Sequence, residues 1–198
     1  MIVVNNYKKV FVIGLALVMF LAFYIYYIYM SNINKPITQV TILGDYMSYS
    51  NADDLEKNAD LIIVGTPLKE FSECTPTITY NEFGRYDNFY TVSDIRISKI
   101  LKGQYQSDTI PVLQNAAIDK KENIMLVDEG YSVMKKGKKY LLFLKKSPLE
   151  GYYILGINEG KHSVDNSDVK EKEVAENDSH YKDIKQEVLK KYSDKLAN

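Results

Sequence analysis

Asp60-Leu-Ile-Ile-Val-Gly65 is a compact apolar run about one third of the way along this 198-residue chain. Gly65 and Pro67 end it, which predicts a buried strand followed by a bend. A second compact apolar run, Lys139 to Leu144, is reached through a turn at Gly137. These two runs indicate that β-strands build the core of the chain.

The segments around these runs also read as short strands. Phe89 to Leu101 begins with alternating polar and apolar residues. The apolar positions change from even to odd residue numbers near Asp94, which suggests a bulge where a barrel curves. Thr109 to Gln114 is a further strand, in which Pro111 favours an edge or a strand end. Thr77 to Tyr80 could add a small edge strand.

Two further features complete the predicted fold. Tyr152 to Ile157 and Lys161 to Val164 are joined by Asn158-Glu-Gly160, which reads as a hairpin. Ser50 to Asp60 reads as a short helix with Ser50 as its cap. The whole pattern predicts a mainly β protein: a small OB-like β-barrel of about 5–7 strands, with a short helix before it and a helix after it.

The C-terminal part divides into two segments. Residues 166–178 are highly charged and poor in large apolar side chains, so we expect a solvated linker. Residues 179–196 predict an amphipathic helix. Its apolar positions recur at helical spacing: Tyr181, Ile184, Val188, Tyr192 and Leu196. This helix could dock on its own barrel, bind a partner, or lie on a surface.

An apolar run of 21 residues, Val10 to Met30, follows Lys8 and Lys9. A helix of this length measures about 31 Å, close to the thickness of a bilayer's hydrocarbon core. We therefore expect a membrane anchor that includes Val10, Phe20, Tyr24, Tyr27 and Met30. The alternative is a cleaved secretory signal, but the run is long, its distal end is bulky, and no Ala-x-Ala pattern follows.

The anchor sets the expected organisation of the chain. Residues 1–9 would be a cytoplasmic tail, 10–30 the anchor, 31–49 a stalk and 50–165 the barrel domain. Lys8 and Lys9 lie before the run and Lys35 is the nearby base after it, which favours a cytoplasmic N-terminus and an external domain. A cytoplasmic domain and a domain secreted after signal cleavage are the alternatives.

Composition limits the compartment and the partners. One cysteine leaves nothing to form an intramolecular disulfide, and an exported domain without disulfides is typical of Gram-positive bacteria. Without Lys8 and Lys9 the chain has 23 basic and 26 acidic residues. It therefore has no global positive field, and we expect no nucleic acid among its partners.

Three segments recur in a recognisable order: Ala59-Asp-Leu-Ile-Ile-Val-Gly65, Ile97-Ser-Lys-Ile-Leu-Lys-Gly103 and Lys136-Gly-Lys-Lys-Tyr-Leu-Leu-Phe-Leu144. This arrangement resembles uncharacterised membrane-anchored exported domains of Bacillus-type bacteria. It is similar to the OB-type barrel of the tissue inhibitors of metalloproteinases and netrin-like modules. The resemblance covers roughly residues 58–165 and implies the barrel.

The inhibitory chemistry of that family does not carry over. Those inhibitors bind a protease zinc through a processed N-terminal cysteine, whereas this chain has an anchor near its N-terminus and its only cysteine is Cys74. The matching positions are scaffold positions, and a shared fold alone gives no function.

Candidate catalytic groups are few. Cys74 would need a nearby base or positive field to be a nucleophile, and Glu73 beside it acts in the opposite sense. His162 and His180 are too far apart in sequence to form the short-range pair of a zinc site, and we expect His162 to be half exposed. The acidic pairs at Asp53-Asp54 and Asp128-Glu129 are read as solvated faces. We expect no catalytic residue, cofactor or metal.

A basic turn is the predicted contact surface. Four lysines flank Gly137: Lys135, Lys136, Lys138 and Lys139. Aromatic residues such as Tyr86 and Tyr90 could interleave with them, as in OB barrels that bind polymers. Outside the cell the anionic partners would be cell-wall polymers or lipid headgroups. The alternative is a basic turn that only keeps a hairpin soluble.

The sequence therefore predicts a single-pass, membrane-anchored, extracytoplasmic interaction module that is not an enzyme. Its expected partners are the lipid bilayer and an envelope protein or an anionic cell-wall polymer. A protease-inhibitor-like module and an envelope enzyme without a recognisable motif are the alternative functions.

Overall fold

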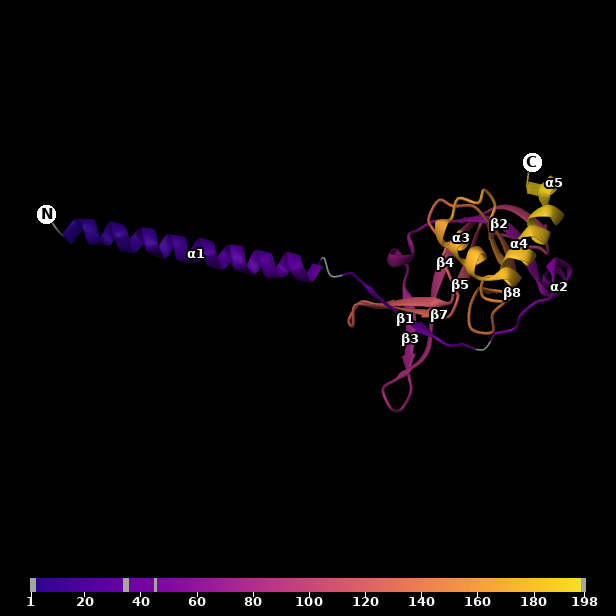
Figure 1. Ribbon diagram of the computed structural model, residues 1–198, viewed down its shortest axis with the longest axis horizontal. Coiled ribbons are helices and arrows are strands. Elements are labelled where there is room, and N and C mark those ends of the chain that lie inside the picture. Colours follow the sequence, from indigo (N-terminus) through magenta and orange to yellow (C-terminus); the bar gives the residue numbers. More distant parts are fainter. Residues whose placement is uncertain (1–2, 34–35, 45, 197–198) are drawn as a thin grey trace. The chain divides into compact units, whose positions relative to one another are not determined.

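The computed structural model describes residues 3–33, 36–44 and 46–196. The chain forms two compact units, one up to Ile37 and one from Thr38 onward (Figure 1). The first unit contains the helix α1 (Val3–Ile33). Its segment Lys9–Met30 has a mean hydropathy of 2.4 and no buried residue, so it is long and apolar enough to cross a membrane. The expected anchor residues Val10, Phe20, Tyr24, Tyr27 and Met30 are all exposed on it.

Five strands close into a β-barrel in the second unit. They are β2 (Leu61–Pro67), β4 (Tyr86–Lys102), β5 (Thr109–Gln114), β8 (Tyr140–Lys146) and β9 (Tyr152–Ile154). The order around the ring is β8-β2-β4-β5-β9, and β9 pairs again with β8. The strands β5 and β9 run parallel, and the other four pairs are antiparallel. The predicted small, mainly β barrel is confirmed.

Further strands extend this ring. β3 (Pro76–Tyr80) pairs with the first part of β4 and forms a hairpin that extends from the barrel (Figure 1), which confirms the edge strand predicted there. β10 (Lys161–Ser163) pairs with the start of β8. In β4 the pairing with β2 skips Ser98 and Leu101, so the bulges lie there and not near Asp94.

A separate sheet lies beside the barrel in the order β1-β7-β6. Its strands are β1 (Thr38–Ile42), β6 (Ala116–Asp119) and β7 (Ile124–Asp128), and β1 runs parallel to β7. The expected stalk over residues 31–49 is therefore wrong in its second half. Alternating β-branched residues in Thr38-Gln-Val-Thr-Ile42 pair with an available sheet edge, and Tyr49 is buried.

The two apolar runs are continuous because both faces of their strands are buried. In β2, Leu61 and Ile63 belong to the core inside the barrel, whereas Ile62 belongs to a second core outside it. In β8, Leu142 lies inside and Phe143 outside in the same way.

Helices cover the outer core. They are α2 (Ala52–Asn58), α3 (Val169–Asn177), α4 (Ser179–Lys191) and α5 (Ser193–Leu196), and a short 3-10 helix, η1 (Phe71–Glu73), follows β2. Ile184 and Val188 of α4 pack with Leu55 of α2 in the outer core. The predicted C-terminal helix is confirmed, and its apolar face is used for docking on its own barrel, so it is not free to bind a partner helix.

Three local predictions are corrected. Residues 169–177 are the helix α3 and not a linker, because Asp168 caps it and Glu171 is buried in hydrogen bonds. The helix cap of α2 is Asn51, one residue after Ser50. The predicted hairpin over residues 152–164 is wrong, since β9 and β10 both pair with β8 and the segment between them loops out.

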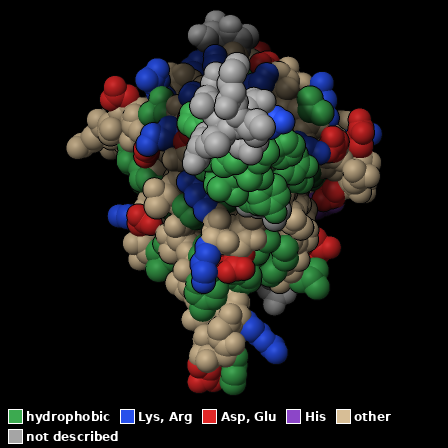
Figure 2. All heavy atoms as spheres, turned by 90° about the vertical axis from the view of Figure 1, so that its left-hand side faces the viewer, with side chains coloured by type: hydrophobic (Ala, Val, Ile, Leu, Met, Phe, Trp, Pro, Cys, Tyr) green, Lys and Arg blue, Asp and Glu red, His purple; other side chains and the backbone are tan. Residues whose placement is uncertain are grey.

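Charged side chains are spread over the surface. Figure 2 shows Lys and Arg interspersed with Asp and Glu on the face in view, without a large area of one sign. This agrees with the nearly balanced composition.

Candidate ligand-binding cleft

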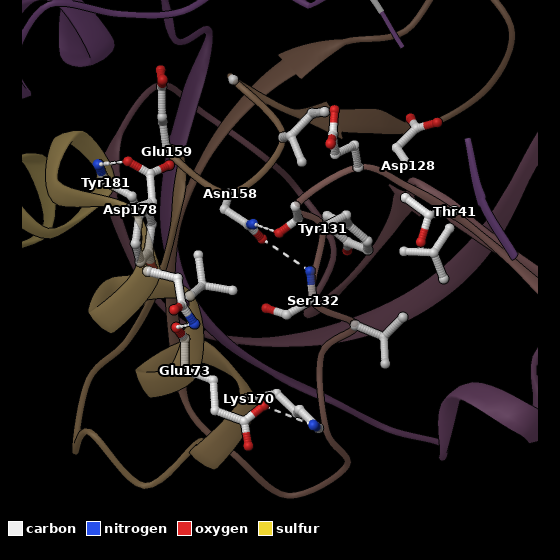
Figure 3. Close-up of a pocket in the computed structure, with 18 of the residues that line it drawn as sticks. Thr41, Asp128, Tyr131, Ser132, Asn158, Glu159, Lys170, Glu173, Asp178 and Tyr181 are labelled. Atoms are coloured by element: carbon white, nitrogen blue, oxygen red, sulfur yellow. Dashed lines mark hydrogen bonds and ion pairs between the residues drawn. The ribbon is translucent and has the colours of Figure 1, made fainter. Parts of the chain in front are cut away.

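A cleft of about 830 Å³ opens on the second unit. Its walls come from β1 and β7, from the segment Gly130–Val133, from the loop between β9 and β10, and from α3 with the start of α4 (Figure 3). The cleft is therefore assembled from segments that lie far apart in the sequence.

The loop between β9 and β10 is built on an unusual backbone. Gly156 and Ile157 have φ angles of 55° and 57°. The left-handed region is rare for a β-branched residue, and such strain costs about 1–3 kcal/mol. Ile157 is buried in the barrel core, which offsets that cost. A Cβ at Gly156 would lie 2.5 Å from the Glu159 carboxylate, so glycine is required there.

Asn158 fixes the floor of the cleft from this loop. Its Oδ1 accepts a hydrogen bond of 3.2 Å from the backbone N–H of Ser132, and its Nδ2 donates to the carbonyl of Gly130 (Figure 3). Glu159 is held nearby, because its carboxylate accepts bonds of 2.7 Å from Ser48 Oγ and from the Tyr49 N–H. The loop is therefore tied to two other segments of the domain.

A buried lysine lies against the floor. Lys161 Nζ donates to the carbonyl of Ser132, lies 2.8 Å from Ser132 Oγ, and sits 4.7 Å from the centre of the Tyr131 ring. Burial lowers the pKa of Lys161 to about 8, although Glu171 and Asp168 act in the opposite direction. Its ammonium is thus satisfied by hydrogen bonds and an aromatic face.

The walls of the cleft are predominantly acidic. The lining contains five carboxylates and two lysines: Asp128, Glu129, Glu159, Glu173, Asp178, Lys135 and Lys170. Lys170 is already paired with Glu173 at 2.7 Å. Half-burial raises the pKa of Asp128, and a hydrogen bond from Asn115 partly opposes this. A cleft with this charge favours cationic groups over anionic ones.

The lysines of the predicted basic turn lie just before β8. Lys135 lines the cleft, and Lys136 pairs with Glu73 at 3.8 Å. Lys138 and Lys139 precede β8, while Lys145 and Lys146 lie at its far end. Whether the turn forms a contact surface stays a prediction.

The predicted aromatic partners lie on β4, and each hydroxyl has an acidic acceptor. Tyr86 donates to Asp119 at 3.2 Å, and Tyr90 donates to Glu150 at 3.4 Å. Their role in binding a partner stays a prediction.

The reactive side chains that the sequence singled out lie outside the cleft or are used in the core. Cys74 is half buried, with Ser93 Oγ at 3.5 Å. His162 is fully buried and not half exposed as expected, because its ring stacks on Tyr181 and meets Phe143 edge-on. In the described ranges, no group of three or more His, Cys, Asp or Glu side chains could hold a metal ion.

Sequence reasoning missed most of the cleft. In the sequence, Asn158-Glu-Gly160 indicated only a turn, and nothing marked Ser132 as a residue of a binding site. Asp128 was recognised as half of an acidic pair, but nothing in the sequence placed it opposite α3. Comparison of the chain with models of known protein families and with curated proteins finds no match, so the cleft is interpreted from its geometry.

Proposed function

We propose that this chain is a membrane-anchored, extracytoplasmic binding module whose acidic cleft takes a ligand carrying a positively charged group. The single observation that carries the proposal is the cleft of about 830 Å³ with five carboxylates against two lysines. A concave site with a few polar groups on a rigid scaffold is the usual form of a ligand site. An anionic cell-wall polymer would meet repulsion in this cleft, so it would have to bind elsewhere.

The anchor would hold the module at the outer face of the cell membrane. Support comes from the apolar length of Lys9–Met30 and from the lysines that precede it. Anchoring would raise the effective concentration of weak contacts with other envelope components. Secretion after signal cleavage is the alternative location.

We further propose that the barrel is of the OB type. Three sequential antiparallel strands, β2, β4 and β5, are followed by β8, which pairs back with β2, and by β9 between β8 and β5. A closed five-stranded barrel with such crossed connections is the architecture of that class. A relationship to the netrin-like modules stays a prediction, and no observation favours a protease-inhibitor function.

The test uses the full chain in lipid nanodiscs and two probes of equal length. Pentane-1,5-diammonium should slow amide hydrogen exchange in residues 130–133 and 155–160, whereas neutral pentane-1,5-diol should not. The double variant Asp128→Asn with Glu173→Gln should reduce the exchange protection that pentane-1,5-diammonium gives by about tenfold or more. Asp94→Asn is the matched control, since Asp94 is an exposed acid outside the cleft lining. The proposal would be overturned if the diol protected these amides as well as the diammonium does. It would also be overturned if Asp94→Asn lost as much protection as the double variant.

A second candidate function, an envelope hydrolase, is favoured by one contact. Ser132 is a lining residue whose Oγ lies 2.8 Å from Lys161 Nζ, and a lysine in its neutral form can take the proton of a serine that attacks a carbonyl carbon. The binding module is preferred because the backbone N–H of Ser132 is already bonded to Asn158 and is not available to stabilise an oxyanion.

A fluorophosphonate probe separates the two functions. A hydrolase would form a phosphonyl ester at Ser132, with loss of fluoride and transfer of the hydroxyl proton to Lys161. The binding module predicts no labelled Ser132 peptide by mass spectrometry in the full chain, with the same result in Ser132→Ala. Labelling that disappears in Ser132→Ala and in Lys161→Met would favour the hydrolase.

A further inference from the structure

The strand β1 leaves one edge of its sheet open. In its pairing with β7, the N–H of Thr38 donates to the carbonyl of Asn123 at 3.2 Å, and the carbonyl of Ile42 accepts from the N–H of Glu129 at 2.8 Å. In a parallel ladder the same residue uses both its N–H and its C=O toward one neighbour. Residues 38, 40 and 42 therefore face β7, and Gln39 and Thr41 direct their backbone groups to the open edge.

These groups are available for pairing. Among the described strands β1 is the outermost of its sheet, the ladder alternation turns the backbone N–H and C=O of Gln39 and Thr41 away from β7, and both residues are exposed. Proteins usually protect such an edge with a charge, a proline or a covering segment. Thr38-Gln-Val-Thr-Ile42 has no charge and no proline, whereas the edge strand β3 begins with Pro76.

We propose that β1 pairs antiparallel with β1 of a second copy of this chain, with Val40 at the two-fold axis. Gln39 would then lie opposite Thr41 of the other copy, and Thr41 opposite Gln39. Each of these pairs exchanges two backbone hydrogen bonds, so all four open groups of each copy find partners. The register is self-complementary, as a two-fold interface requires.

The geometry favours this direction of pairing over the parallel one. Only the antiparallel register sets the outward-facing residues Gln39 and Thr41 opposite each other under a two-fold axis. The strand itself is uncharged, so nothing within it opposes the contact.

This inference rests on the membrane anchor of the proposed function, which would supply the local concentration that so short a strand needs. Four hydrogen bonds would not hold two freely diffusing domains together, because association costs translational and rotational freedom. Thr38 follows the helix α1 by only five residues, so anchoring two copies in one membrane would raise the effective concentration of one β1 strand for the other.

Pairing would also extend the cleft. Gln39 and Thr41 line it, and residues directly opposite in an antiparallel pair lie on the same face of a sheet. The second copy would therefore add its own Gln39 and Thr41 beside this wall.

Cysteine cross-linking of the full chain in liposomes tests the register. In a Cys74→Ser background, Val40→Cys should form a disulfide-linked dimer, since the paired Cα atoms would be about 4.5 Å apart. Thr38→Cys alone and Ile42→Cys alone should not cross-link, but a mixture of the two should. Parallel pairing would hold Thr38 of one copy far from Ile42 of the other, so the mixture would not cross-link.

A proline variant shows whether the open edge carries the contact. Thr41→Pro removes an N–H that faces outward, so it should reduce the Val40→Cys dimer at least tenfold while circular dichroism stays unchanged. If Thr41→Pro unfolds the domain, cross-linking between Thr38→Cys and Ile42→Cys chains still decides the register. The proposal is overturned when Val40→Cys links no faster than Thr38→Cys, or when Thr41→Pro leaves the dimer unchanged. Cation binding in the cleft is measured separately, so failure here does not decide the proposed function.

Discussion

Lys161 and His162 are adjacent polar residues of the strand β10, and both are fully buried. Lys161 is held by Ser132 and the ring of Tyr131. His162 has an aromatic environment instead, between Tyr181 and Phe143. A buried imidazole in such a place stays neutral, and burial lowers the pKa of His162 to about 3.

This shift makes the stability of the domain depend on pH. The unfolded chain takes up a proton at His162 near pH 6.5, whereas the folded chain does so only near pH 3, so stability falls as the pH falls below 6.5. Between pH 7 and pH 5 this residue should remove about 2 kcal/mol from the free energy of unfolding. Urea unfolding of the full chain in micelles, followed by circular dichroism, measures the loss.

His162→Phe isolates this contribution. Phenylalanine keeps an aromatic ring in the same place and does not titrate, so the variant should lack that loss of about 2 kcal/mol. The same pH dependence in the variant and the original chain would contradict the assignment.

Gly65 is required by close packing between β2 and β4. A Cβ at this position would lie 2.5 Å from Ile95 Cγ2 and 3.1 Å from the carbonyl of Arg96. Gly65→Ala should therefore lower the free energy of unfolding by about 1–3 kcal/mol. Gly44→Ala is the control, because its Cβ would meet only Asp128 at an ordinary 3.5 Å. Equal stability of the two variants would contradict this packing.

At the scale of elements, the C-terminal helices differ in how far the sequence revealed them. The spacing of Tyr181, Ile184 and Val188 predicted α4, because these side chains meet one apolar surface. The helix α3 was missed, since it has few apolar residues and is held by polar groups. Glu171 accepts a bond of 2.8 Å from the N–H of Ser163 and lies 2.9 Å from Lys185 Nζ.

Docking of α4 should contribute strongly to stability. Ile184 is 1% exposed and packs in the outer core, so Ile184→Ala should cost about 2–5 kcal/mol. Lys182→Ala, on the exposed side of the same helix, should change the free energy of unfolding by less than about 0.5 kcal/mol. A small effect of both substitutions would mean that α4 does not dock on the barrel.

At the scale of the whole molecule, the sequence predicted what depends on local periodicity. Continuous apolar runs revealed β2 and β8, and the long run at Val10 to Met30 revealed the helix able to cross a membrane. The strand β1 was missed because five residues of modest hydrophobicity read as a stalk. The cleft could not be predicted, since Asp128, Ser132 and Glu173 come together only through the sheet and helix packing.

The proposed anchored domain on the outer face of the membrane is tested most directly by labelling of intact cells. In a Cys74→Ser background, Gln106→Cys places a thiol on an exposed position of the barrel domain, and Asn6→Cys places one before the apolar run. We predict that a membrane-impermeant maleimide labels Gln106→Cys in intact cells, in the membrane fraction, and labels Asn6→Cys only after permeabilisation. Labelled domain in the medium would contradict the anchor, and labelling of Gln106→Cys only after permeabilisation would contradict the orientation.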